Sequence, residues 1–73
     1  MKEKLIEILK EALEIESVNL DDYLDGYDNW DSLTRLSLIA LIDENFEIQV
    51  SDQEFNEFET GEDLYKALLK KKN

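Results

Sequence analysis

The residue with the clearest chemical potential in this 73-residue sequence is Ser32, which follows Asp31 in the run WDSLTRLSLIALIDENF. The run starts after a polar stretch and continues as the most apolar segment of the chain. Ser32 is therefore predicted to lie where a loop ends and a helix begins. A serine in that place can cap the helix, act as a nucleophile or carry a modification, and Asp31 could equally be the cap.

Catalysis by Ser32 lacks its usual partners. A hydrolase-type serine needs a general base within hydrogen-bond reach, and the sequence contains no histidine and no cysteine. The G-x-S-x-G turn of many hydrolases is also absent. We predict no catalytic residue and expect that the chain is not an enzyme.

Calcium binding is the second chemistry that the polar stretch before Ser32 suggests. Aligning Gly26 with the invariant glycine of an EF-hand puts Asp21 and Asp25 at ligand positions. The same alignment puts Tyr23 at a third ligand position and Ser32 where a bidentate glutamate is required. The match fails, so no specific metal site is predicted.

Phosphate chemistry fits the place of Ser32 better. The first turn of a helix offers unpaired backbone N–H groups and the positive end of the helix dipole. Both stabilise a phosphate attached to a serine oxygen at that point. The sequence thus favours Ser32 as a modification site, with a simple capping role as the alternative.

The helix that begins at Ser32 or Leu33 and ends near Phe46 divides into two faces at about 100° per residue. The predicted core face carries Leu38, Ile39, Ile42 and Phe46. A second strip joins small apolar residues to carboxylates and is predicted to dock partner proteins: Leu33, Leu36, Ser37, Ala40, Asp43 and Glu44. The alternative is that a helical core uses both faces of this helix.

Hydrophobic periodicity predicts an all-α fold with four helices, one of them short. A first helix is expected over residues 2–16, followed by a long loop over 17–31 that lies across the helices. Ile48 and Val50 in the connector after Phe46 are expected to fill the core. We expect the 73 residues to form one small domain.

The last two helices carry start signals. Ser51 and Glu54 match a capping box and predict a short third helix that ends near Phe58. Thr60 is predicted to cap the fourth helix, with acids in its first turn and lysines in its last turns.

The net charge of −11 is unevenly distributed, because Arg35 is the one basic residue between residues 19 and 63. This field repels nucleic acid and anionic lipid and attracts basic protein surfaces. The longest apolar run, Leu38 to Ile42, is too short to span a membrane, and the start of the sequence does not match a secretory signal. We expect a cytoplasmic monomer.

The run Asp31-Ser32-Leu33, followed by an apolar helix that ends Ile42-Asp43-Glu44-Asn45-Phe46, resembles the acyl carrier protein signature. The resemblance covers nearly the whole chain, since the predicted order and lengths of helices and loops also match. It implies a four-helix acyl-carrier fold with a long loop after the first helix. The version with Trp30 before the motif resembles freestanding carriers outside the main fatty-acid type.

The resemblance also implies function. Ser32, flanked by Asp31 and Leu33, would bear 4′-phosphopantetheine transferred from coenzyme A by a phosphopantetheinyl transferase. Acyl or aminoacyl groups would travel as thioesters on this arm to enzymes with basic docking patches, which would meet Asp43, Glu44 and Glu47. The competing hypothesis is an unmodified acidic adaptor that binds a basic partner through the same helix.

Several residues depart from the family pattern. Thr34 and Ser37 stand where fatty-acid carriers tend to have acids, and Arg35 adds a base, so different partners are expected. Gly61 replaces an apolar residue and predicts a slightly looser start of the last helix. Trp30 is predicted to anchor the long loop over the core, with contact to the arm or its cargo as the alternative.

Overall fold

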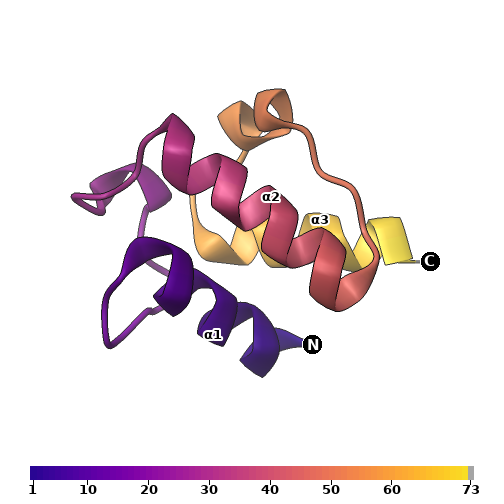
Figure 1. Ribbon diagram of the computed structural model, residues 1–73, viewed down its shortest axis with the longest axis horizontal. Coiled ribbons are helices and arrows are strands. Elements are labelled where there is room, and N and C mark those ends of the chain that lie inside the picture. Colours follow the sequence, from indigo (N-terminus) through magenta and orange to yellow (C-terminus); the bar gives the residue numbers. More distant parts are fainter. Residues whose placement is uncertain (73) are drawn as a thin grey trace.

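The computed structural model describes residues 1–72 and is all-helical in that range (Figure 1). Three α-helices and two short 3₁₀ helices follow one another along the chain: α1 (Lys2–Leu13), η1 (Leu24–Gly26), α2 (Ser32–Phe46), η2 (Asp52–Glu57) and α3 (Gly61–Lys72). The predicted all-α class and the order of four main helices are confirmed. The start of α1 and the end of α3 lie on the same side of the molecule in Figure 1.

One bound of the predicted elements was wrong. The short third helix is present as η2, a 3₁₀ helix, and the long loop contains the 3₁₀ turn η1. Helix α1 ends at Leu13 and not at residue 16, because Glu14 adopts the left-handed conformation with φ of 57°. The N–H of Ile15 then donates to the carbonyl of Lys10 at 3.1 Å, a Schellman-type ending.

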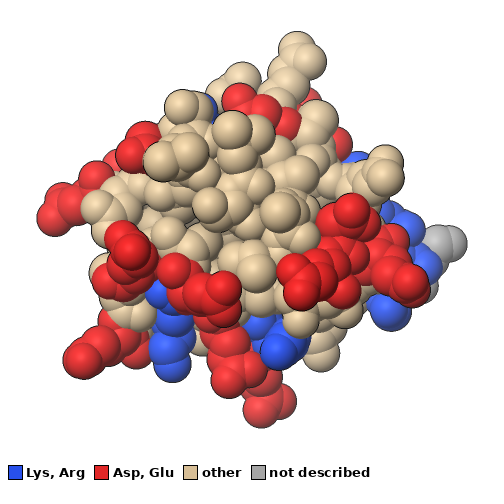
Figure 2. All heavy atoms as spheres, in the orientation of Figure 1, with Lys and Arg blue, Asp and Glu red and all other residues tan. Residues whose placement is uncertain are grey.

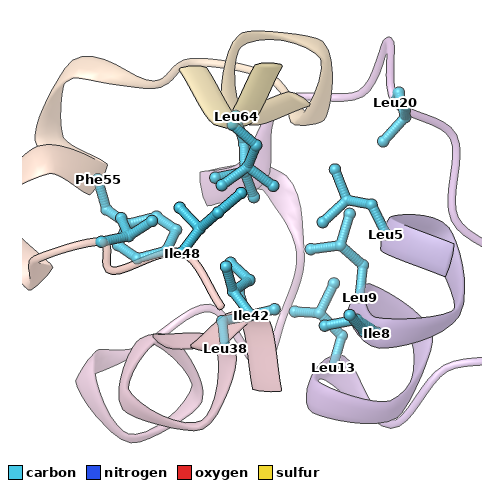
Figure 3. Close-up of a cluster of buried hydrophobic side chains, with 12 residues drawn as sticks. Leu5, Ile8, Leu9, Leu13, Leu20, Leu38, Ile42, Ile48, Phe55 and Leu64 are labelled. Atoms are coloured by element: carbon cyan, nitrogen blue, oxygen red, sulfur yellow. The ribbon is translucent and has the colours of Figure 1, made fainter. Parts of the chain in front are cut away.

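The core lies between α1, α2, α3 and the connector after α2 (Figure 3). Helix α2 contributes one row of buried residues, Thr34, Leu38 and Ile42, spaced four apart. The connector residues Ile48 and Val50 are buried as predicted. The remaining core side chains come mostly from α1 and α3: Leu5, Ile8, Leu9, Leu13, Leu20, Phe55, Leu64 and Leu68.

The long loop over residues 17–31 lies against the rest of the molecule, as its apolar residues predicted. Leu20 and Leu24 are buried, and the loop pairs with the segment before α3. The N–H of Leu24 donates to the carbonyl of Glu59 at 2.8 Å, and the N–H of Glu62 donates to the carbonyl of Leu20 at 2.9 Å. These bonds fix the loop that leads to Ser32.

Both predicted helix caps are present. Ser51 and Glu54 form a complete capping box at η2. At α3, the hydroxyl of Thr60 accepts from the N–H of Asp63 at 3.2 Å, and the carboxylate of Asp63 accepts from the N–H of Thr60 at 3.3 Å. No helix within residues 1–72 has the length and apolar character to cross a membrane.

Gly61 corrects the expectation of a looser start of the last helix. This glycine is buried against the loop, and a Cβ built on it would lie 2.7 Å from Cδ2 of Leu20 and 3.2 Å from its Cα. The missing side chain therefore lets the loop approach α3 closely, at the point where Glu62 bonds to Leu20. The start of α3 is tightly packed.

We expect Gly61→Ala to lower the free energy of unfolding by about 1–3 kcal/mol, because the added methyl must displace Leu20. Urea denaturation measures the change. The matched control is Gly26→Ala, whose Cβ would meet its nearest atom, Cβ of Tyr23, at an ordinary 4.0 Å. Equal stability of the two variants would contradict the close-packing role of Gly61.

Candidate functional site

Helix α2 begins with Asp31 as its N-cap. Asp31 has extended backbone angles, and its carboxylate accepts a hydrogen bond from the N–H of Thr34 at 2.8 Å. Its carbonyl accepts a hydrogen bond from the N–H of Arg35 at 3.0 Å, which is the first main-chain hydrogen bond of the helix. The two alternatives for the cap are thereby decided in favour of Asp31 and against Ser32.

The electrostatics agree with this assignment. Hydrogen bonding by the backbone N–H of Thr34 holds the pKa of the Asp31 carboxyl below its ordinary value. Contact with the N–H of Leu33 and the charge of Arg35 act in the same direction. The cap is therefore a carboxylate at neutral pH, in the place where a helix dipole favours negative charge.

Ser32 is the first residue of α2, and its side chain is exposed. Within residues 1–72 its hydroxyl makes no hydrogen bond, because Asp31 already caps the helix. A group attached to the Ser32 oxygen would project into solvent and would displace no structural contact. The site therefore fits a bulky phosphate-linked group on this oxygen.

A polar network that sequence reasoning missed holds the approach to Ser32. The side-chain amide of Asn29 donates to the carbonyl of Leu13 at 2.7 Å and so caps the C-terminus of α1. The buried hydroxyl of Thr34 donates to the carbonyl of Asn29 at 2.6 Å. The end of α1, the loop and the first turn of α2 are thus joined through two side chains.

The signal for this network was weak in the sequence. The sequence marks Thr34 only as a departure from the acids that fatty-acid carriers tend to have there, whereas the structure places it in the buried row with Leu38 and Ile42. An Asn three residues before a helix fits many loop conformations, so its bond to Leu13, across the loop, could not be read from spacing.

The outward strip of α2 is exposed along its length. Leu33 and Leu36 are 73% and 56% exposed, and their spacing of three residues puts them side by side on the helix as a small apolar patch. Ser37, Ala40, Asp43 and Glu44 are exposed as well, and Glu47 lies just past the helix with φ of 57°. Figure 2 shows apolar and uncharged atoms over α2 and carboxylates gathered near its C-terminal end.

The structure thus brings Ser32 and the predicted docking residues onto one continuous surface of α2. A shallow groove of about 270 Å³ runs beside it, between α1 and α2, and is lined by Glu11, Glu14, Leu33 and Ser37 among others. Arg35 does not join this strip. It turns toward η2 and forms an ion pair with Asp52 at 2.7 Å.

Trp30 is half-buried and packs on Phe55 of η2, with ring centroids 5.7 Å apart and an interplanar angle of 70°. This edge-to-face contact ties the end of the loop to η2, as predicted for an anchoring tryptophan. Among residues 1–72, no three acidic side chains are grouped so that they could hold a metal ion.

Comparisons with known proteins agree with this geometry. Residues 3–68 match the family described as a phosphopantetheine attachment site. The solution structure of a holo acyl carrier protein from Geobacter metallireducens has the same fold, with a TM-score of 0.78. It is 21% identical, and the alignment covers 94% of this chain and 82% of that one. No curated protein matches the chain.

The chain belongs to the phosphopantetheine attachment-site family, because the family match covers most of its length. It is a carrier protein whose prosthetic group is 4′-phosphopantetheine. The predicted family, fold and cofactor are confirmed, and nothing favours the unmodified adaptor.

We expect Thr34→Val to lower the free energy of unfolding by about 1–2 kcal/mol, because the carbonyl of Asn29 loses the buried hydroxyl that donates to it. Ser37→Ala is the matched control, since it removes an exposed hydroxyl from the same helix and should change stability by about 0.5 kcal/mol or less. Thermal and urea unfolding measure both. A Thr34→Val protein as stable as the control would show that the network does not hold the site.

Proposed function

We propose that Ser32 is the residue that carries 4′-phosphopantetheine. One observation at the start of α2 supports this assignment: Asp31 caps the helix, and Ser32 stays exposed. Ser37 is a second exposed serine on α2, but it lies more than one turn into the helix. It lacks the unpaired first-turn N–H groups that favour a phosphate.

The attachment exchanges the phosphoanhydride bond of coenzyme A for a phosphodiester on the serine. The Ser32 oxygen forms a bond to the phosphorus next to the pantetheine part of coenzyme A, and the bond from that phosphorus to the adenosine bisphosphate breaks. The serine proton passes to a base of the transferase, because this chain has no histidine or cysteine near neutral pKa to take it. The phosphodiester then lies at the positive end of the α2 dipole.

The loaded protein works by tethering. The terminal thiol of the arm carries an acyl or aminoacyl group as a thioester, and the arm presents it to successive enzymes at high effective concentration. The protein supplies the attachment point and the docking surface, and its partners supply the catalysis. Similarity to a holo acyl carrier protein supports an acyl cargo.

The outward strip of α2 is the proposed docking surface for these partners. Leu33, Leu36 and Ala40 would make the apolar contact, and the exposed hydroxyl of Ser37 lies between them. Three carboxylates at the end of the helix would meet basic patches: Asp43, Glu44 and Glu47. Such docking is fast, reversible and sensitive to salt, which suits a carrier that must leave each enzyme quickly.

The partners we propose are a phosphopantetheinyl transferase and acyl-activating or acyl-transferring enzymes. Nucleic acid is not among them, because the net charge of −11 repels it. We propose that residues 1–73 act as one monomeric carrier unit. A cytoplasmic location stays a prediction.

Incubation of the apo protein with coenzyme A and a broad-specificity phosphopantetheinyl transferase should add the mass of one phosphopantetheine. Ser32→Ala should abolish this gain, and intact-mass spectrometry reads it directly. Ser17→Ala, at an exposed position of the long loop outside the docking surface, is the matched control and should still be loaded. Loading of Ser32→Ala, or loss of loading in Ser17→Ala, would refute the assignment of Ser32.

The double reversal Asp43→Lys, Glu44→Lys should lower kcat/KM for loading by the transferase about tenfold at low salt, because it removes attraction to a basic partner. The loss should appear mainly in KM and should shrink as salt is added. Glu3→Lys, Glu7→Lys on the exposed side of α1 changes the net charge equally and serves as the control. An equal loss in both variants would mean that total charge, and not the end of α2, guides docking.

A further inference from the structure

A second concave site lies between η1, the end of the long loop and η2. It is a cleft of about 480 Å³, a volume within the range of small-molecule sites. Its walls include four aromatic side chains and two carboxylates: Tyr23, Trp30, Phe55, Phe58, Asp25 and Glu59. The attachment of phosphopantetheine and the docking strip of α2 do not account for these residues.

The aromatic walls are held in place. Phe55 is buried at 4% exposure and packs edge-to-face against Trp30 and against Phe58, with ring centroids 5.7 Å apart in both pairs. Trp30 and Phe58 are half-buried, and Tyr23 is 61% exposed. The cleft thus presents accessible aromatic surface on a fixed support.

The two carboxylates come from different parts of the chain. Asp25 lies in η1 and Glu59 lies just before α3, and the bond from the N–H of Leu24 to the carbonyl of Glu59 holds these segments together. Neither carboxylate forms an ion pair within residues 1–72. By contrast, nearby Asp52 and Glu54 are paired with Arg35 and Lys71.

Aromatic surface and unpaired carboxylates together select for an organic cation. The faces of tryptophan and tyrosine attract ammonium groups, and a carboxylate at the rim adds direct charge attraction. A purely apolar chain in the same cleft would cover the two carboxylates without giving them a partner, which is costly. The chemistry of the walls therefore distinguishes between charged and neutral occupants.

The cleft also adjoins the attachment point. Trp30 is two residues before Ser32, so their Cα atoms are at most about 7 Å apart. An arm on Ser32 has many rotatable bonds and starts next to the cleft wall. We propose that this cleft binds the ammonium group of an amine-bearing acyl cargo carried on the arm of the same molecule. This inference rests on the proposed attachment at Ser32.

An isosteric pair of cargoes tests the proposal. The holo protein is loaded with a β-alanyl or a butyryl group, which differ in an ammonium against a methyl at the same position, and intact mass confirms each product. Trp30 is the single tryptophan, so its indole N–H resonance reports on the cleft alone. The β-alanyl group should shift this resonance relative to the butyryl group, and added salt should reduce the difference.

Matched variants locate the binding site. Asp25→Asn, Glu59→Gln should abolish the difference between the two cargoes, because it removes both carboxylates of the cleft. Asp28→Asn, Glu57→Gln changes the charge equally at exposed positions outside the cleft and should preserve the difference. Identical shifts from both cargoes, or a difference that survives the first variant, would overturn the proposal.

A free ligand tests whether the cleft binds a cation without requiring that an arm be attached at Ser32. β-Alaninamide titrated into the unmodified protein should bind at least about fivefold more tightly than the neutral butyramide, the gain expected from a cation on an aromatic face. Equal binding of the two amides would overturn the cation site whatever the fate of Ser32. Binding of free β-alaninamide without any effect of the tethered β-alanyl group would overturn the assignment to cargo.

Discussion

The hydrogen bond from the N–H of Thr34 to the carboxylate of Asp31 is the interaction on which the functional surface depends. It caps α2 at Asp31, one residue before Ser32, and leaves the serine hydroxyl outside the hydrogen bonding of the fold. Had Ser32 been the cap, modification of its oxygen would have removed the cap as well. Asp31 thus stabilises the start of the helix, so that modification of Ser32 does not weaken it.

The remaining contacts keep this helix start in one place. Asn29 joins the loop to the end of α1, and the buried hydroxyl of Thr34 joins the same loop to α2. On the opposite side, the close approach of Leu20 to Gly61 fixes the loop against α3. A loop of this length costs ordering entropy, so these bonds are what make the position of Ser32 reproducible for a partner.

The local rules of helix formation predicted much of this from sequence. The capping box at Ser51 and the burial of Leu38 and Ile42 follow from residue type and period, so they could be read directly. Ile39 and Phe46, also predicted for the core face of α2, are only half-buried. The left-handed ending at Glu14 and the role of Gly61 could not be read directly, because both depend on what another segment places nearby. The bond from Asn29 to Leu13 is of the same kind, since it spans the whole loop.

The unfolding free energies of Ser32→Ala, Asp31→Asn and Asp31→Ala, measured side by side in urea, test the separation of roles most directly. The capping account predicts that Ser32→Ala and Asp31→Asn stay close to the parent protein, because Asn retains an acceptor for Thr34, while Asp31→Ala is clearly destabilised. A Ser32→Ala protein as unstable as Asp31→Ala would contradict it, because the serine hydroxyl would then be part of the fold.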